Sequence, residues 1–361
     1  MTGRSELSSL NSARSPHFRN IKRVRASHLK RMGVRCKAGK VLVADIGGTN
    51  ARFLLWDVAE NSHEKRTYAT ADFPTFESCM QALMEQLSVT EVDAACFAVA
   101  GVVKDGCCHM TNTGWSIDSK ILESQFPIRR VELMNDFEAI GHGIFELDAG
   151  DLITLHGGTR NPTGPIAVVG PGTGLGEAIL LWNSHSRRYD IHATEGSHAD
   201  FAARGEIQHE LALWVEKSLT QCEVEHVCSG PGLIRIYDFL RSRCTESLPT
   251  LNAFEITANA RSKSCPICVQ AVDIFLEILG GEAANLGLKC LATGGVYIAG
   301  GIPSKMRDLV TSGSLLESFL CAGSKFSAVR ASFPLYVVLN QDVGLVGAKA
   351  VAVQLLDGVA H

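Results

Sequence analysis

The sequence has no apolar run approaching the ~20 residues that a helix needs to cross a bilayer, so we expect no transmembrane segment. Its 12 cysteines are scattered through predicted strands and helices rather than spaced as a disulfide framework. Cys265 and Cys268 form a lone C-x-x-C pair, without a second pair or a histidine cluster at zinc-binding spacing. We therefore expect buried thiols, with this pair near a helix start. Cys107 and Cys108 follow a turn, where a redox role would require an exposed thiol of low pKa.

Two common nucleotide-binding signatures are absent. The nearest approach to a P-loop, Gly33 to Gly39-Lys40, has five intervening residues rather than four and is followed by Val41 rather than Ser or Thr. A dinucleotide fingerprint requires G-x-G-x-x-G at the start of a helix. Between positions 170 and 176 glycine instead occupies every second position, and the residues that follow favour a strand. Any bound phosphate must therefore be held by residues other than those of a P-loop or a dinucleotide-binding fingerprint.

Acidic residues are almost missing from the first 39 positions, which carry 10 Lys or Arg and only Glu6 as an acid. This Arg- and Ser-rich composition, without the apolar core of a secretory signal, is typical of an organellar transit segment, chloroplast or mitochondrial. The alternatives are a basic arm without an address in a cytoplasmic protein, and a tail that contacts RNA or a membrane. The remaining 24 basic and 37 acidic residues give a net charge of −13. Such an acidic body predicts no nucleic-acid partner and no stable membrane insertion.

The first positive feature is the hairpin-like run from Val41 to Leu55, where two β-forming segments flank Gly47-Gly48-Thr49-Asn50. Adjacent glycines permit positive φ and leave backbone N–H groups uncovered, while Thr49 and Asn50 add side-chain donors. Asp45, inside the first strand, can then face a metal ion bound to the phosphates. An ordinary tight hairpin would carry the same pattern.

Two further glycine turns strengthen the phosphate interpretation. Residues 166–181 repeat the strand, glycine turn and strand arrangement, with Gly172, Thr173 and Gly174 at the turn. A third buried strand ends in Gly300-Gly301, and Pro303 could open a helix at its first position. Three such turns along one chain indicate one nucleotide held between two α/β lobes around a cleft, rather than a single doubly wound sheet.

The charge pattern predicts a basic segment over residues 1–39. Loop signals at Gly150 and over 157–164 indicate that a second lobe begins near residue 150, after a first lobe that starts at residue 40. We expect helices over about 75–87, 206–217, 256–261, 268–290 and 344–356.

Polar residues beside predicted strands and turns are candidates for chemistry. Asp136 follows Asn135 where a buried strand passes into a helix, so it could accept a proton from a substrate hydroxyl or simply cap the helix. Glu195 and His198 share a short loop that could bind the hydroxyls of a polyol or be a solvated turn. Glu225 precedes a Gly-Pro-Gly turn and could be a further hydroxyl acceptor or a surface helix residue.

Together, the motifs resemble those of the bacterial-type ATP-dependent glucokinases in order and approximate spacing. The similar segments are Asp45–Arg52, His109–Asn112, Asn135–Phe137, Gly172–Gly176, Glu195–His198, Ser229–Leu233 and Ile298–Gly301. The resemblance covers residues 40 to about 355. It implies the actin/hexokinase-type fold with two RNase-H-like lobes and a final helix that returns to the first lobe. The small lobe would then comprise 40–149 plus 341–361, and the large lobe 150–340. The resemblance further implies glucose and ATP as substrates, Mg²⁺ as cofactor and a homodimer.

The resemblance also implies roles for individual residues. Asp136 would be the general base, and Asn135, Glu195, His198 and Glu225 would hold the other sugar hydroxyls. Asp45 would face Mg²⁺ through water. The residues implied to bind ATP are Gly47, Gly48, Thr49 and Asn50 in the first turn, Gly172, Thr173 and Gly174 in the second, and Gly300 and Gly301 beside the adenosine.

Two departures from the family pattern bear on selectivity and grouping. Thr194 and Ser197 stand where the family commonly has glycine, which puts hexose selectivity in question. The cysteine-rich zinc motif of the related repressor/open-reading-frame/kinase group has no counterpart here. The alternatives are a kinase for another hexose or an amino sugar, and a non-catalytic sugar sensor of the same fold.

Overall fold

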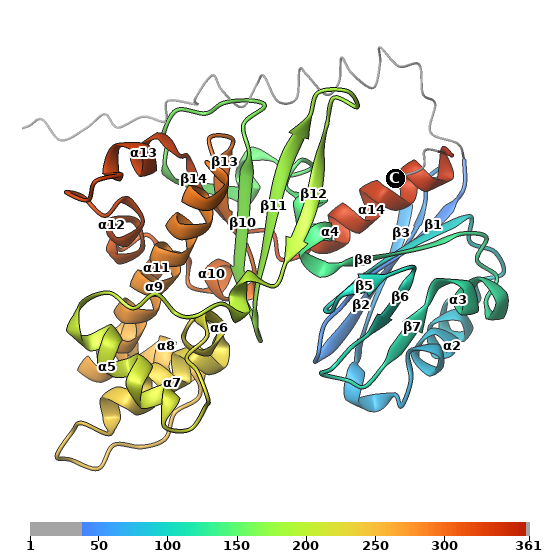
Figure 1. The fold of residues 1–361 in the computed structure, drawn as a ribbon. Coiled ribbons are helices and arrows are strands. Elements are labelled where there is room, and N and C mark those ends of the chain that lie inside the picture. The colour runs from blue at the N-terminus through green and yellow to red at the C-terminus, as the bar shows by residue number, and fades with distance from the viewer. Residues whose placement is uncertain (1–37, 359–361) are drawn as a thin grey trace, which may run out of the picture. The chain divides into compact units, whose positions relative to one another are not determined.

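The computed structural model describes residues 38–358. The basic segment predicted as a targeting sequence therefore lies outside the described residues, apart from its last two positions. The described chain builds a five-stranded sheet, a six-stranded sheet and a small three-stranded sheet, with helices packed on the two larger ones (Figure 1).

The five-stranded sheet has the order β3-β2-β1-β4-β8. Its strands are β1 (Lys40–Ile46), β2 (Asn50–Asp57), β3 (Ser62–Ala69), β4 (Ala94–Val99) and β8 (Val131–Asn135). β1 is buried on both faces, because Leu42 and Ala44 join the apolar cluster of α2 (Phe76–Leu87) while Val41 and Val43 pack with a helix at the C-terminal end of the chain. That double burial explains why β1 reads as a continuous apolar run.

Shorter elements complete this part of the chain. They are η1 (Thr70–Asp72), the small sheet of β5 (Val103–Lys104), β6 (Cys107–His109) and β7 (Ser116–Asp118), and α3 (Ser119–Gln125). The hairpin between β5 and β6 turns at Asp105 and Gly106, both with positive φ.

The six-stranded sheet has the order β12-β11-β10-β13-β14-β9. Its strands are β9 (Leu152–His156), β10 (Ile166–Pro171), β11 (Leu175–Asn183), β12 (Arg188–Thr194), β13 (Gly295–Ile298) and β14 (Leu335–Val338). One face packs on the long helix α9 (Pro266–Cys290), and Ala167 and Val169 of β10 join that cluster. Ile166 and Val168 point to the other face, toward Tyr297 and Val343.

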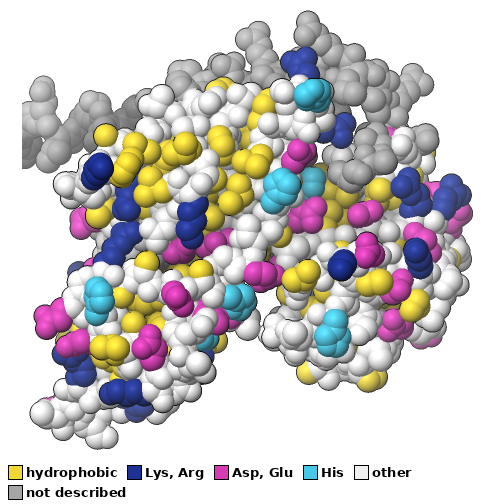
Figure 2. Space-filling view, viewed as in Figure 1, with side chains coloured by type: hydrophobic (Ala, Val, Ile, Leu, Met, Phe, Trp, Pro, Cys, Tyr) yellow, Lys and Arg dark blue, Asp and Glu magenta, His cyan; other side chains and the backbone are white. Residues whose placement is uncertain are grey.

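The remaining helices surround this sheet. They are η2 (Ala149–Asp151), η3 (Gly196–His198), α5 (Gly205–Glu216), α6 (Val224–Val227), α7 (Gly230–Arg241), α8 (Ala253–Ser262), α10 (Gly301–Lys305), α11 (Arg307–Val310), α12 (Ser314–Leu320) and α13 (Ser327–Ser332). Figure 2 shows acidic and basic side chains interspersed over the visible face of the described residues.

The last helix, α14 (Val343–Leu356), packs against β1, β4 and α4 (Asp136–Gly143), as Figure 1 also shows. The C-terminal end of the chain therefore returns to the first sheet. The division into two lobes with boundaries at residues 149 and 341 stays a prediction, although the mixed α/β fold class is confirmed.

Several local predictions need adjustment. Pro303 is the third residue of α10, not its first. The Gly-Pro-Gly stretch after Glu225 is no turn: Gly230 starts α7, and the Ser229 hydroxyl accepts a hydrogen bond from Gly232 N–H. Cys265 is the N-cap of α9, as its position near a helix start predicted.

The 11 cysteines in the described residues are free thiols, and six of them are buried, which agrees with the expectation of mostly buried thiols only by a narrow margin. A hydrogen bond to Asp118 raises the pKa of the exposed Cys107 thiol, which is the opposite of what a redox role requires. Among residues 38–358, no single helix has the length and apolar composition needed to cross a membrane, and only the bent pair α8 and α9 meets that test jointly.

Candidate active site

The first glycine turn joins β1 to β2 and is closed by a hydrogen bond from Gly47 N–H to Asn50 C=O (2.9 Å). Neither Gly47 nor Gly48 has positive φ, so conformational freedom is not what these glycines supply. A Cβ on Gly48 would lie 3.1 Å from Cβ of Asn112, which is tighter than ordinary packing. Close approach of Asn112 favours glycine at position 48, and the Gly47 N–H is already engaged within the turn.

The second turn, between β10 and β11, is closed by Gly172 N–H donating to Gly174 C=O (2.7 Å). Open space surrounds the position of a Cβ on Gly172, whereas one on Gly174 would collide with the Glu225 carboxylate. Glu225 Oε2 accepts a hydrogen bond from Leu175 N–H (2.8 Å). Glu225 is therefore attached to this turn rather than being a free surface residue of α6.

The third turn lies against the second. Gly300 has a φ of +89°, and a Cβ there would lie 2.5 Å from the Pro171 carbonyl oxygen. The structure thus brings together two of the three predicted phosphate turns, at neighbouring strands β10 and β13 of one sheet.

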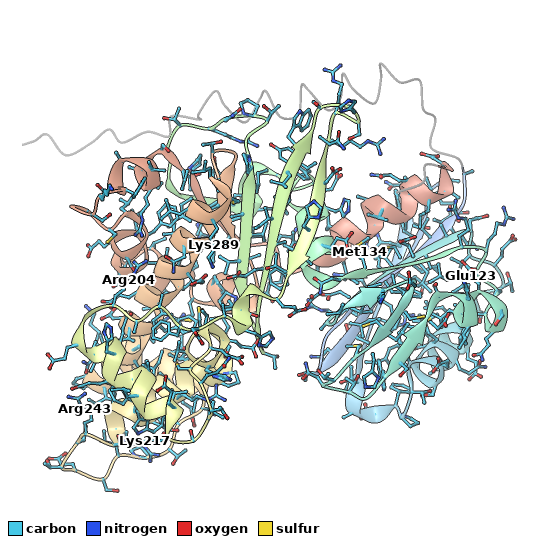
Figure 3. All side chains as sticks on the ribbon, viewed as in Figure 1. Glu123, Met134, Arg204, Lys217, Arg243 and Lys289 are labelled. Carbon is cyan, nitrogen blue, oxygen red and sulfur yellow. The ribbon has the colours of Figure 1, made fainter. Side chains whose placement is uncertain are left out.

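Asn135 and Asp136 stand where β8 ends and α4 begins, next to Met134, which Figure 3 labels. Asn135 is the N-cap: its Oδ1 accepts from Phe137 N–H (2.8 Å), and its Nδ2 donates to Gly101 C=O (3.1 Å). The alternative explanation of Asp136 as the N-cap is therefore wrong. Asp136 is the first helical residue, and Oδ1 also accepts from Phe137 N–H (3.0 Å).

Burial, followed by the charge of Asp45, raises the pKa of Asp136 to about 7, and the charge of Glu195 adds to this effect. The pKa of this one carboxyl group is therefore raised both by Asp45, in the five-stranded sheet, and by Glu195, which directly follows β12 of the six-stranded sheet. A carboxyl with a pKa near neutrality is suited to taking up a proton at physiological pH.

Asp45 is paired with Arg52, its partner across the β1/β2 ladder, at 3.0 Å between Oδ2 and Nη2. Arg52 Nη1 also donates to the Gln341 carbonyl (3.2 Å), just before α14. Burial raises the pKa of Asp45, while the Arg52 charge lowers it and that of Asp342 raises it. Arg52 was part of the recognised sequence motif, but no neighbouring residue indicated that its side chain would contact Gln341, just before α14.

The Phe137 ring joins Asp136 to the second glycine turn. A Cβ on Gly176 would collide with this ring, and one on Gly170 would lie 3.0 Å from it. The glycines of β10 and β11 therefore make room for the first turn of α4. This contact fixes the helix that begins with Asp136 against the strands on either side of the second predicted phosphate turn.

The predicted sugar loop follows β12, with Glu195 as the N-cap of η3 and His198 as its last residue. His198 Nδ1 lies 2.7 Å from Glu223 Oε2, while its Nε2 lies 3.7 Å from Glu195 Oε2. The hydrogen bond with Glu223 raises the pKa of His198, and the same bond lowers the pKa of Glu223. Sequence analysis missed Glu223, which carries no recognisable motif.

The two residues that depart from the family pattern fit this loop. Ser197 is buried at 2% exposure, and the Thr194 hydroxyl accepts a hydrogen bond from Gly196 N–H (3.2 Å). Both side chains therefore hold the loop in place where glycine would leave it freer.

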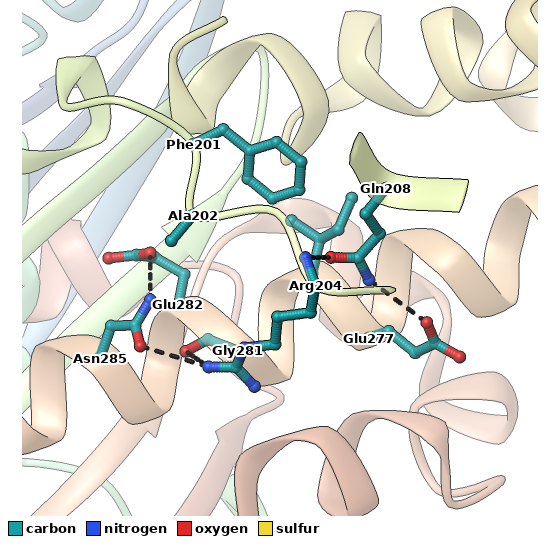
Figure 4. Close-up of a pocket in the computed structure, with 9 residues that line it drawn as sticks. Phe201, Ala202, Arg204, Gln208, Glu277, Gly281, Glu282 and Asn285 are labelled. Atoms are coloured by element: carbon teal, nitrogen blue, oxygen red, sulfur yellow. Dashed lines mark hydrogen bonds between the residues drawn. The ribbon is translucent and has the colours of Figure 1, made fainter. Parts of the chain in front are cut away.

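A separate pocket of mostly polar side chains lies between residues 201–204 and α9 (Figure 4). Arg204 crosses it to Asn285 Oδ1 (3.2 Å) and Gly281 C=O (3.3 Å). None of the predicted site residues lines this pocket.

Within residues 38–358, no three His, Cys, Asp or Glu side chains form a metal-binding group. Mg²⁺, however, is commonly held by one or two carboxylates together with water and substrate phosphates. The single carboxylate of Asp45 beside the first turn fits a metal ion that arrives with a nucleotide.

Phosphoryl transfer to an alcohol requires a positioned proton acceptor and uncovered backbone amides around the phosphates. In the described residues each of the two larger sheets contains a glycine-turned hairpin, and the Asp136 carboxyl stands at the end of a strand of the first sheet. This arrangement fits a kinase of the actin/hexokinase fold class. The chain belongs to the glucokinase family, whose model matches residues 42–355.

Individual comparisons agree with the family. A glucokinase from Nostoc sp. (strain PCC 7120 / SAG 25.82 / UTEX 2576) is 34% identical over 342 residues, covering 87% of this chain and 99% of the relative. The crystal structure of a glucokinase from an Antarctic psychrotroph has a TM-score of 0.74 at 30% identity, covering 88% of this chain and 99% of the other. A Balamuthia mandrillaris glucokinase in complex with glucose shares the fold, with a TM-score of 0.74 at 24% identity, covering 94% and 99% of the two chains.

Proposed function

We propose that this chain is a glucokinase that transfers the terminal phosphoryl group of ATP to the 6-hydroxyl of D-glucose, the entry step of glycolysis. Family membership and the geometry at Asp136 support the proposal. The observation that carries it is a buried carboxyl with a pKa of about 7 at the end of β8, attached through Phe137 to the second glycine turn.

In the proposed step, one carboxylate oxygen of Asp136 takes the proton of the 6-hydroxyl while the hydroxyl oxygen attacks the terminal phosphorus. The bond between that phosphorus and the bridging oxygen breaks, and ADP leaves. Asn135, Glu195, His198 and Glu225 hold the other hydroxyls, which suits their chemistry because each hydroxyl both donates and accepts. The His198–Glu223 bond orients the imidazole for this task.

The phosphates are proposed to lie between the first two glycine turns, with Gly48, Thr49 and Asn50 on one side. Gly47 contributes shape rather than a donor, because its N–H closes the turn. Gly172, Thr173 and Gly174 would face them from the second turn, where the Gly172 N–H, like that of Gly47, is used to close the turn. Gly300 and Gly301 would lie beside the adenosine. Asp45 would hold Mg²⁺ through water, and the metal would supply charge to the phosphates.

A coupled assay with ATP and glucose tests this function directly. We expect turnover by the unmodified chain and a loss of about 10²–10⁴-fold in kcat for Asp136→Asn, with glucose binding largely kept, because the amide has the shape of the acid but accepts no proton. Asp72→Asn, at an exposed position of η1, is the matched control. Wild-type turnover by Asp136→Asn would show that the base is another residue.

The same assay with a panel of hexoses and amino sugars tests selectivity. Thr194 and Ser197 stiffen the sugar loop, which is the observation that favours a kinase for another sugar. We expect glucose to give the highest kcat/KM. Glucose binding without turnover would instead identify a sugar sensor.

We further propose that residues 1–39 target the protein to an organelle, on the evidence of their acid-poor, Arg-rich composition. A homodimer is likewise a prediction, which sedimentation of the purified chain would check.

A further inference from the structure

Glu177 of β11 is a buried acid that the proposed reaction does not use. Its side chain is 1% exposed, and in the sheet it pairs with Thr194, the last residue before the sugar loop. A Cβ on Gly196, inside that loop, would collide with Glu177 Oε2. The carboxyl therefore lies directly against the backbone that carries Glu195 and His198.

The surroundings of Glu177 offer little to a negative charge. Its Oε1 is buried and has no hydrogen-bond partner among the described residues. On α9 the nearest charged groups are Glu282, 5% exposed, and Lys289, whose Nζ lies 3.7 Å from Glu282 Oε1. Glu282 also accepts a hydrogen bond from Asn285 Nδ2 (3.1 Å), drawn in Figure 4. Lys289, the cation that lowers the pKa of Glu177, is thus already paired with another carboxylate.

Other titratable groups face the same region. The thiol of Cys228, at the end of α6, has its pKa raised by burial, with further increases from Glu282 and Glu177. The adjoining loop brings Glu195 and His198. Burial first, and Glu282 next, raise the pKa of Glu177 to about 7, and Lys289 opposes them.

We propose that Glu177 is a positioning residue for the sugar loop Glu195–His198, and that it supports the loop in its protonated, neutral form. Ionisation would place an unpaired buried charge beside Glu282, and that charge is stabilised only if the carboxylate moves toward water or the loop moves away. Either movement shifts Gly196 and the two sugar-binding side chains beside it. Glucose affinity should therefore be highest below about pH 7 and fall as the pH rises through that value.

The first test measures the glucose dissociation constant by calorimetry between about pH 6 and about pH 8.5. It uses the Asp136→Asn background, in which the titration of the proposed base is absent. We expect the dissociation constant to rise about tenfold with pH when Glu177 is present and to rise clearly less in Asp136→Asn/Glu177→Gln, where His198 is the sugar-binding group that still titrates. The control variant combines Asp136→Asn with Glu277→Gln. Glu277 is a part-buried acid on α9 that is bonded to Gln208, and its substitution should leave the rise in the dissociation constant intact.

The outcomes separate this inference from the proposed function on which it rests. The same rise in the presence and absence of Glu177→Gln would overturn the role of Glu177 alone. No glucose binding by the unmodified chain at any pH would contradict the proposed function, and with it the loop's role.

The second test changes the packing between Gly196 and Glu177 rather than the charge of Glu177. Gly196→Ala introduces the colliding Cβ and should raise the glucose KM about tenfold with little change in kcat. Gly196→Ala/Glu177→Ala removes the group that is struck and should recover most of the loss. If the double variant binds glucose no better than Gly196→Ala does, while its thermal transition matches that of the wild type, the added Cβ does not act through Glu177, and the contact on which the proposal rests is wrong.

Discussion

At the scale of single residues, the pKa of Asp136 determines how the reaction depends on pH. A carboxyl with a pKa of about 7 is protonated in more acidic solution and then cannot take up the substrate proton. We expect kcat to be constant above about pH 8 and to fall about tenfold per pH unit well below pH 7. Rates at saturating glucose and ATP across this range test the expectation. The residual activity of Asp136→Asn should lack this dependence.

Arg52 is a second residue with a testable role. It holds Asp45 at 3.0 Å and reaches the Gln341 carbonyl, so it links the first glycine hairpin to the start of α14. Without its charge the pKa of Asp45 should rise further, leaving less carboxylate for Mg²⁺. We expect Arg52→Gln to raise the KM for Mg·ATP about tenfold and to weaken Mg²⁺ binding, followed by calorimetry with ADP.

Lys65→Gln is the control for this prediction. Lys65 pairs with Asp342 but makes no contact with Asp45. Arg52 also lies near Asp342, at a longer distance of 4.0 Å. An equal effect of the two substitutions would place the cause at Asp342 rather than at Asp45.

These residues show which features of the candidate site can be recognised from local sequence. Asp45, Asp136 and the glycine turns are recognisable because each depends on neighbours within a few positions. Arg52 and Gln341 are 289 positions apart, and His198 and Glu223 are 25 apart, so their contacts exist only after the strands and helices have packed. The surroundings of Glu177 likewise could not be predicted from local sequence, because Glu282, which raises its pKa, lies on another element.

At the scale of elements, the crossing of α4 and α14 depends on glycine. A Cβ on Gly347 would collide with the Ala139 carbonyl oxygen, and one on Gly143 would collide with that of Val343. The helix that begins with Asp136 is thus held in backbone contact with the helix that packs on β1. This close approach accounts for both glycines within helices, where glycine is otherwise unfavourable.

We expect Gly347→Ala to destabilise the fold by about 1–3 kcal/mol through overpacking and to lower the thermal midpoint by several degrees. Gly150→Ala is the matched control, because no atom lies within 4 Å of its added Cβ. Calorimetric melting of the two variants compares them. Equal midpoints would mean that the helices move apart at little cost.

The elements themselves were predicted unevenly. Amphipathic α2 and the apolar α14 follow from their local pattern, and both hairpins follow from glycine between β-forming runs. The start of α7 was missed because Gly-Pro-Gly is usually a turn, while here Ser229 caps the helix that it opens. β9 and β14 pair across more than 170 positions, and such pairing has no signature in either segment.

At the scale of the whole molecule, charge divides the chain at about residue 39, with 10 basic residues against one acid before it and a net −13 after it. The family model begins at residue 42, and every proposed site residue lies between Asp45 and Gly301. The segment before residue 40 is therefore separate from the catalytic part in both composition and family match.

Removal of residues 1–39 should consequently leave kcat and the glucose KM within about twofold of the full chain's values. The thermal midpoint should stay within a few degrees, because all of the packing around Asp136 is retained. A fluorescent fusion of the full chain should enter an organelle, and the shortened fusion should stay in the cytosol. If both fusions stay in the cytosol, the segment is a basic arm without an address. If the shortened enzyme loses activity while its melting is unchanged, the segment contributes to catalysis, and the separation drawn from charge and family match is wrong.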